Sequence, residues 1–335
     1  MEEVTIRTIA KKANVSHTTV SRALNGSPLV KEVTRRRIQA LADELGYVPN
    51  LNAKGLVEKH SFLIGIFFSE LENGTSPSFL VNVINRAKEA LPSGYSLSID
   101  SIETLNRAHG VARQQYDGAI VVSQSKQDDT FIDTLINRQL PIVVLNRKIG
   151  RQDISNFAPN DYLGAKKILE YAVRMGHRKF GVIKGASGFV SAVDRQQAFD
   201  DVLSEQGLIT KNDWCKSGDY LPESGYDAMR EILSASDIPT CVFAANDDMA
   251  VGAIRACQDL GYQVPTDISI IGYDDMSYAQ YLIPKLTTVH KPTNEIVQAG
   301  IEALTEQLVS GQVKVSQKII DPTVIIRDSV KDLRK

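Results

Sequence analysis

Short apolar runs that alternate with helical segments constrain the fold of this chain more than any other feature. Six runs rich in β-branched residues lie at 62–68, 119–122, 142–145, 180–183, 241–244 and 268–271. Helical patterns lie between them, at 79–91, 162–175, 195–205 and 249–260. Continuous apolar runs of this length are typical of parallel strands buried on both faces. The alternation predicts an α/β core of open, mostly parallel sheets with helices on both faces.

This core is too long for one sheet, and we divide it into two parts near Asp161. Ligands of such sheets bind at the carboxyl ends of the strands. Polar residues follow several of the predicted strands; they are Ser69, Glu70, Asn146, Asn246 and Asp274. Another polar residue, Arg195, opens a predicted helix after the loop at 185–188. The sequence therefore predicts a polar ligand site at the carboxyl ends of the strands.

The first 56 residues form a different pattern, which indicates a small helical module. Thr5 is a good N-cap for a first helix, with inward residues Ile6, Ile9, Ala10 and Ala13. Asn14 tolerates a tight left-handed turn, and Ser16 caps a second short helix. The two make a helix-turn-helix, whose second helix fits the major groove of DNA. A third helix ends at Gly46 and closes the core with Val33, Ile38, Leu41, Ala42 and Leu45.

Charge is divided unevenly between this module and the rest of the chain. Residues 1–60 carry ten Lys and Arg against six Asp and Glu, a net charge of +4. The remainder carries 28 against 34, a net charge of −6. A basic head on an acidic body indicates that only the head meets a polyanion, although a solvated helix surface gives the same charge count.

Other classes of protein are disfavoured by what the sequence lacks. The charged start at Met1 has no apolar run behind it, and no stretch approaches 18 apolar residues, so we expect no signal peptide, no membrane contact and a cytoplasmic location. Cys215, Cys241 and Cys257 lack CxxC spacing and are interpreted as reduced thiols. We expect no metal and no cofactor.

Several segments resemble the lactose-repressor/galactose-repressor family of bacterial transcription regulators. In the head they are Ile9-Ala10, Ala13-Asn14-Val15-Ser16, 19–25 (TVSRALN) and 45–50 (LGYVPN). In the body they are 244–247 (AAND), 267–275 (DISIIGYDD) and 286–289 (LTTV). The resemblance thus covers nearly the whole chain. It implies an N-terminal all-α helix-turn-helix DNA-binding head and an α/β two-lobed periplasmic-binding-protein-like (type I) core.

The same resemblance implies the domain bounds. The helix-turn-helix domain is expected at 1–49, and a hinge helix with its linker at 50–61. In this fold the chain crosses back near His290 and again near Asp321, so that both lobes are discontinuous. The first lobe is expected at 62–161 with about 291–321, and the second at 162–290 with about 322–330.

The exposed face of the second helix is expected to read DNA. His17, Thr18 and Arg22 are the candidates for base contacts, and Arg22 can pair with guanine for about 1–3 kcal/mol of discrimination. The structural alternative for His17 and Thr18 is ordinary solvent exposure. Residues better placed for phosphate contacts are Thr5, Ser16, Thr19, Ser21, Asn25, Tyr47 and Asn50.

The segment after the head is expected to couple the two parts of the chain. By resemblance it forms a hinge helix only on operator DNA, where Leu56 of each subunit wedges into the minor groove. Ala53 leaves room for two hinge helices, and Lys54 stands where Arg is frequent in the family. A plain Asn- and Gly-containing linker is the alternative.

A sugar effector is expected in the cleft between the lobes. The family's effector cleft is lined at the positions that match Asn146, Arg195, Tyr220, Asn246 and Asp274. Carboxylates and amides can bind sugar hydroxyls, and Tyr220 or Phe79 can cover the apolar face of the ring. Ser69 and Glu70 complete the predicted set. Asn146 stands where many sugar-binding members carry Asp, which leaves the identity of the sugar open.

Each of these residues also has a structural alternative. Asp274 and Asp275 can cap a helix that begins at Met276, and Asn246 can cap the helix that follows it. Tyr220 can serve packing alone, and Arg195 can pair on the surface with Asp194 or Asp200.

The resulting hypothesis is a homodimeric repressor of a carbohydrate-utilisation operon. Two heads bind a pseudo-palindromic double-stranded operator, and a sugar or sugar phosphate in the cleft controls the affinity. One rival is a corepressor-dependent or phosphoprotein-assisted global carbon regulator. A transport-type sugar-binding protein and a glycosidase that uses Asp274 and Asp275 are the others.

Overall fold

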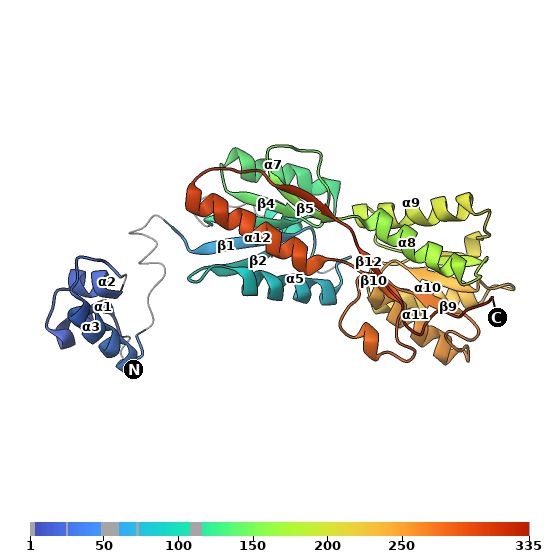
Figure 1. Ribbon diagram of the computed structural model, residues 1–335, viewed down its shortest axis with the longest axis horizontal. Helices are drawn as coiled ribbons and strands as arrows, with labels where there is room; N and C mark the ends of the chain where they lie inside the picture. Colours follow the sequence, from blue (N-terminus) through green and yellow to red (C-terminus); the bar gives the residue numbers. More distant parts are fainter. Residues whose placement is uncertain (1–3, 25, 48–59, 72–73, 108–115, 335) are drawn as a thin grey trace. The chain divides into compact units, whose positions relative to one another are not determined.

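The structure, a computed structural model, describes residues 4–24, 26–47, 60–71, 74–107 and 116–334. It divides into two compact units, Met1–Ser61 and Phe62–Lys335, which we call the head and the core (Figure 1). No helix in the described ranges is both long and apolar enough to cross a membrane.

The described part of the head contains three short helices, α1 (Ile6–Ala13), α2 (His17–Leu24) and α3 (Glu32–Glu44). The Thr5 side chain accepts a hydrogen bond from the Thr8 amide, and Ser16 does the same for Thr19 at the start of α2. Asn14, between α1 and α2, has a φ of 50°, the left-handed conformation that the tight turn needs. The buried residues are Ile9, Ala10, Ala13, Val20, Ala23, Val30, Ile38 and Ala42.

One predicted core position of the head is wrong. Val33 lies in the first turn of α3 and is 82% exposed. Val30, in the loop before α3, is 7% exposed and fills the interior. The helical periodicity could not anticipate this, because it describes the helix and not the loop that leads into it.

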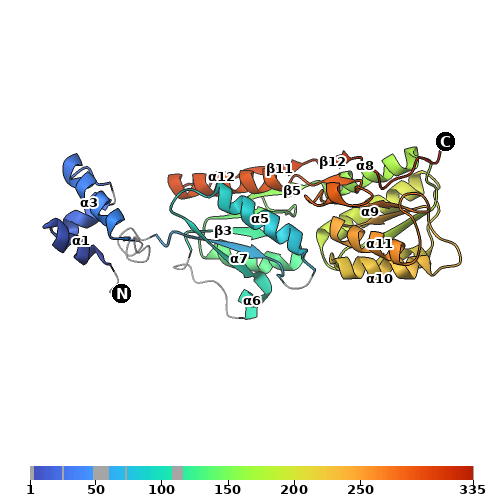
Figure 2. The same ribbon diagram turned by 90° about the horizontal axis from the view of Figure 1, so that it is seen from below.

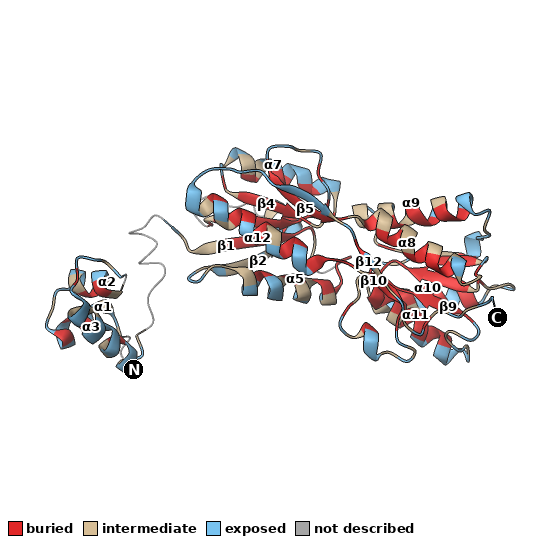
Figure 3. Cartoon of the chain, in the orientation of Figure 1, coloured by how far each residue is buried: buried red, intermediate tan, exposed pale blue. Residues whose placement is uncertain are grey.

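The first lobe of the core is built on a six-stranded parallel sheet in the order β11-β5-β4-β3-β1-β2. Its strands are β1 (Leu63–Phe68), β2 (Ser96–Ser101), β3 (Gly118–Val122), β4 (Ile142–Leu145), β5 (Ser155–Pro159) and β11 (Gln317–Ile320). Helices α5 (Pro77–Ala90) and α12 (Thr293–Ser310) pack on one face, and α6 (Ile102–Arg107) and α7 (Asp129–Asn137) on the other. The central strands are buried on both faces (Figure 3).

The second lobe has a four-stranded parallel sheet in the order β7-β6-β8-β9. Its strands are β6 (Phe180–Lys184), β7 (Cys215–Ser217), β8 (Cys241–Ala244) and β9 (Ser269–Ile271). Helices α8 (Asp161–Arg174) and α9 (Val190–Glu205) pack on one face, and α10 (Pro222–Leu233) and α11 (Asp247–Asp259) on the other. The expected α/β core with helices on both faces of parallel sheets is confirmed.

Three segments join the lobes. The chain passes from β5 directly into α8, from β10 (Thr288–His290) into α12, and from β11 into β12 (Thr323–Ile325). The short strands β10 and β12 pair antiparallel, and Figure 2 shows the long red C-terminal segment that runs along both lobes. Because three separate segments join the lobes, neither lobe is continuous in sequence.

Candidate functional site

The second helix of the head carries the predicted base-reading residues on its outside. His17, Thr18 and Arg22 are exposed, so all three are free to meet a partner. Ser16 and Thr19, two of the predicted phosphate contacts, are joined by a hydrogen bond of 2.8 Å between their hydroxyls.

The other predicted DNA contacts differ in their surroundings. Thr5 is exposed, Ser21 is half-buried, and Tyr47 is half-buried with its side chain against the core of the head. The remaining predictions lie outside the described residues; they are Asn25, Asn50, Ala53, Lys54 and Leu56.

A small cavity of about 30 Å³, partly open to solvent, lies between the two lobes of the core. Its wall contains Gly74, Ser76, Phe79, Gln124, Asn146, Ser191, Arg195, Tyr220, Asn246, Asp274 and Lys291. Six of the eight predicted effector residues are among them. Because β4, β8 and β9 all end near this cavity, the residues that follow these strands meet there although they are far apart in sequence.

Asn246 both caps a helix and faces the cavity. It follows β8, and its side-chain oxygen accepts a hydrogen bond of 2.9 Å from the Met249 amide at the start of α11. Its amide nitrogen donates to the Tyr220 carbonyl at 3.0 Å. The capping alternative is therefore correct for Asn246. One amide hydrogen and one oxygen lone pair are still available to a ligand.

Asp274 is not a helix cap, because no helix begins at Met276. Its carboxylate is only 9% exposed and lies 3.5 Å from Nη2 of Arg195. Asp275 turns away from the cavity and pairs with Arg327 at 2.6 Å and His290 at 3.1 Å. The two adjacent carboxylates thus point to different partners, and only Asp274 reaches the cavity.

Arg195 was expected to open a helix, but it lies in the second turn of α9, which begins at Val190. The guanidinium is 3% exposed and donates to Asp161 at 2.6 and 2.9 Å. It also bonds to the Ala245 carbonyl and stacks 3.6 Å from the centre of the Tyr273 ring. The surface alternative, pairing with Asp194 or Asp200, is wrong.

Burial and neighbouring charges act on these groups in opposite directions. Burial alone lowers the pKa of Arg195, but Asp161 and Asp274 more than offset it, and the pKa of Arg195 is raised. The pKa of Asp274 is raised by burial, against the opposite effect of Arg195 and Lys291. The pKa of Lys291 is lowered by burial. The cavity therefore holds ionisable groups that have lost most of their hydration.

Tyr220 both packs and lines the cavity. Its ring stacks on Phe189 with 6.1 Å between centroids, and its hydroxyl bonds to Ser191 at 3.1 Å. A Cβ at Gly185 would lie 2.2 Å from the Tyr220 hydroxyl, so only glycine fits there. The packing alternative is correct in part, because the ring is 6% exposed and fixed on several sides.

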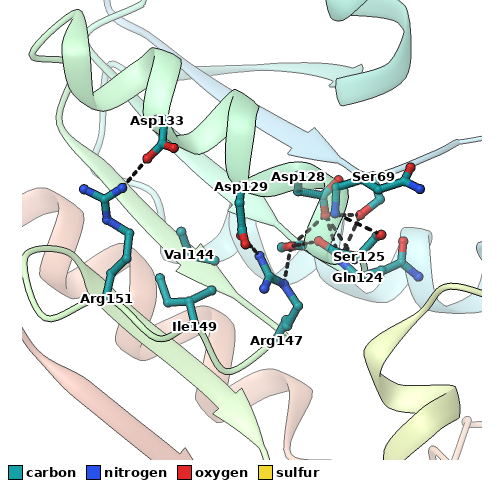
Figure 4. A network of polar contacts seen from close by, with 12 residues as sticks. Ser69, Gln124, Ser125, Asp128, Asp129, Asp133, Val144, Arg147, Ile149 and Arg151 are labelled. Atoms are coloured by element: carbon teal, nitrogen blue, oxygen red, sulfur yellow. Dashed lines mark hydrogen bonds and ion pairs between the residues drawn. The ribbon is translucent and has the colours of Figure 1, made fainter.

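Ser69 and Glu70 do not reach the cavity, contrary to expectation. The Ser69 hydroxyl donates to Asp128 at 2.6 Å and accepts from the Gln124 amide at 2.8 Å (Figure 4). Burial, together with Glu103 and Asp128, raises the pKa of the half-buried Glu70. The chain after β1 turns toward Asp128 in the first lobe, and Ser69 acts by holding Gln124 in place.

Four polar cavity residues were missed by the sequence reasoning: Ser76, Gln124, Ser191 and Lys291. Gln124 follows β3 and Lys291 follows β10, so the strand-end rule could have found both had it been applied to every apolar run. Ser76 is the N-cap of α5 and had no comparable signal. Lys291 is the most consequential omission, because it is a buried cation in the wall.

The two lobes also contact each other at the rim of the cavity. Asp248, in α11, accepts hydrogen bonds from Ser76 and Ser78 at the start of α5, the latter at 3.1 Å, and from Tyr278 at 2.6 Å. The Val190 amide donates to the Gln124 carbonyl at 2.9 Å. Because the bonds from Ser76, Ser78 and Val190 join different lobes, they stabilise the present arrangement of the lobes relative to an opened one.

Comparison with known proteins gives consistent relatives for both units. A model of bacterial regulatory proteins, lacI family, matches residues 5–50, and a model of a periplasmic binding protein-like domain matches 169–330. A probable HTH-type transcriptional repressor, ExuR of Bacillus subtilis (strain 168), is 41% identical over 98% of this chain and 99% of its own length. The HTH-type transcriptional repressor PurR of Klebsiella pneumoniae (strain 342) is 32% identical over 98% of this chain and 97% of its own length.

Solved structures agree with these relatives. A lac repressor dimer bound to operator and the anti-inducer ONPF matches with a TM-score of 0.81 and 26% identity, over 98% of this chain and 100% of its own. A complex of the transcriptional regulator CelR with cellobiose matches with a TM-score of 0.68 and 25% identity, over 97% of this chain and 99% of its own.

Proposed function

This chain belongs to the lacI family of bacterial regulatory proteins and is a transcriptional repressor, and we propose that a small sugar bound between the lobes of its core controls its affinity for operator DNA. The regulated genes are those of a carbohydrate-utilisation operon. The glycosidase and transport-protein alternatives are wrong, because the relatives matched over nearly the full length are repressors.

The observation that carries the proposal is the composition of the interlobe cavity. Asp274, Asn246 and Asn146 offer oxygen and amide groups to hydroxyls, while Phe79 and Tyr220 offer ring surface. The cavity is small in this arrangement of the lobes, about 30 Å³, which favours a small sugar over a large one.

A ligand in this cavity acts on both lobes at once. Phe79 and Asn146 belong to the first lobe, whereas Arg195 and Asn246 belong to the second. A sugar that contacts both sets favours the lobe arrangement in which all its contacts form. Its effect on DNA binding equals its differential affinity for the two arrangements, commonly about 1–3 kcal/mol. We propose that the hinge predicted at 50–61 transmits this change to the head.

The operator is proposed to be a pseudo-palindrome bound by a homodimer. A two-fold symmetric dimer presents two identical heads, so its DNA site repeats in inverted orientation. The similar lac repressor structure is that of a dimer on operator. Sedimentation of this chain at micromolar concentration should give twice the mass of 36.9 kDa, and a purely monomeric protein would contradict this part of the proposal.

The role proposed for Arg22 is tested by replacing it with alanine. DNA sites would first be selected from a random library with the wild-type chain. Arg22→Ala should bind the selected site about 5- to 150-fold more weakly, because a bidentate guanine contact gives about 1–3 kcal/mol. Affinity for unrelated DNA should change little, because the phosphate contacts remain. Fluorescence anisotropy with both DNAs measures the ratio.

Arg36→Ala is the matched control. Arg36 is also an exposed arginine of the head, with its side chain 81% exposed, but it lies on α3 and pairs with Glu32. Its removal should leave the preference for the selected site unchanged. Equal discrimination by wild type and Arg22→Ala would contradict the base-reading role.

A further inference from the structure

Lys291 is a buried cation in the cavity wall, and a neutral sugar supplies no negative charge to pair with it. It follows β10, where the chain crosses between the lobes, and only 6% of it is exposed. Burying an ammonium group is costly unless an anion or several hydrogen bonds compensate it. We therefore expect Lys291 to contact an anion or several hydrogen-bond acceptors.

The partners of Lys291 in the protein are neutral. Its Nζ donates to the side-chain oxygen of Asn146 at 2.6 Å and lies 4.6 Å from the centre of the Phe79 ring. Among the described residues, no carboxylate oxygen lies within the 4.0 Å that defines an ion pair. An amide oxygen and a ring face compensate a full charge only in part.

The nearby carboxylates are already engaged elsewhere. Asp161 and Asp274 both pair with Arg195, at 2.6 and 3.5 Å. Asp248 at the rim accepts from the hydroxyls of Ser76, Ser78 and Tyr278. The wall itself thus contributes two cations, Arg195 and Lys291, and one anion, Asp274. Lys291 forms no ion pair of its own, although Asp161 and Asp274 act on it at longer range, and it lines the space that the ligand occupies.

We propose that the effector is a monosaccharide with a carboxylate group, a sugar acid, and that Lys291 binds this carboxylate. The proposal rests on the proposed function, because it specifies the ligand of the same cavity. A carboxylate carries one negative charge and matches the cation of the cavity wall that has no ion pair. A phosphate monoester carries about −1.5 to −2 near neutral pH and would need a second free cation.

Asn146 positions the ammonium group of Lys291 for the ligand carboxylate. An Asp at this position would pair with Lys291 and cancel its charge. The neutral Asn146 holds the ammonium group in place by one hydrogen bond and leaves its charge for the ligand. Asn146 and Lys291 together are the residues that set the preference for an acidic sugar.

The first experiment is calorimetric titration of the full-length protein with matched ligands. The panel contains glucose and galactose, their 6-phosphates, their uronic acids, and six-carbon aldonic and keto-aldonic acids. At least one acid should bind at least about 10-fold tighter than its neutral counterpart, because a charge-assisted hydrogen bond contributes about 1.5–3 kcal/mol. Tightest binding of a neutral sugar or a sugar phosphate, or no binding of any acid, would overturn the proposal.

Substitutions then test the two residues with the acid that binds best. Lys291→Gln should weaken the acid about 10- to 100-fold and change binding of the neutral counterpart little. Asn146→Asp keeps the lysine but supplies an internal anion, and should weaken the acid similarly. Lys285→Gln, the same change at an exposed lysine outside the cavity wall, is the control and should bind the acid as wild type does.

Further readouts distinguish a failure of the sugar-acid proposal from misfolding of a variant and from a failure of the proposed function. Fluorescence of the single tryptophan, Trp214, which is fully buried in the second lobe, reports whether each variant is folded. An equal loss for acid and neutral sugar in folded Lys291→Gln would contradict the carboxylate contact. A neutral sugar that binds and alters DNA affinity would leave the proposed function standing and overturn the sugar acid alone.

Discussion

Arg195→Met should destabilise the core by about 3–5 kcal/mol and abolish effector binding. The guanidinium is 3% exposed and compensates Asp161 and Asp274, so its removal leaves two buried carboxylates without a cation. Methionine fills much of the space but supplies neither charge nor donors. Urea unfolding followed by Trp214 fluorescence gives the change in stability, and calorimetry with the bound sugar gives the change in affinity.

Two comparisons isolate the buried charges as the cause. Arg86→Met removes a partner from the exposed Arg86–Glu89 pair on α5 and should change stability little. Adding Asp161→Asn and Asp274→Asn to Arg195→Met should restore part of the lost stability, because the two carboxylates that lost their cation are then also neutral. Equal unfolding midpoints for Arg195→Met and wild type would contradict the account of this cluster.

Ile38→Ala should unfold the head and abolish operator binding, while effector binding by the core is retained. Ile38 is fully buried at the centre of the head, and removing such a side chain costs about 2–5 kcal/mol. A unit of this size has a total stability of only a few kcal/mol. Loss of helix signal in circular dichroism, together with DNA binding and calorimetry, measures the effect.

Val33→Ala is the matched control, because Val33 lies on the same helix but is 82% exposed. It should bind DNA as wild type does. If Ile38→Ala also reduced the affinity for the sugar, the head and the core would not be independent units, contrary to the division after Ser61.

The fold could be predicted from the sequence where strands are continuous apolar runs. β1, β3, β4, β6, β8 and β9 are continuous apolar runs because helices cover both faces of the sheets. The edge strands β2 and β11 could not be predicted in this way. Their side chains are largely half-buried or exposed, so their composition resembles that of loops.

The site could be predicted as a region but not residue by residue. The rule that ligands bind at strand ends identified Asn146, Asn246 and Asp274, because parallel strands bring their carboxyl ends to one edge. The rule cannot tell which way a side chain turns after its strand ends, and so it included Ser69 and omitted Lys291. That direction depends on partners such as Asp128, which tertiary packing supplies.

The measurement that tests the central claim most directly is operator affinity with and without the effector. The full-length chain would be titrated against its selected DNA site, in the absence and presence of the sugar that binds best at saturating concentration. We predict a change in the dissociation constant of about 5- to 150-fold for wild type and no change for Asp274→Ala, whose cavity no longer binds the sugar. Equal affinities for wild type with and without saturating sugar would contradict the claim that the cavity controls DNA binding.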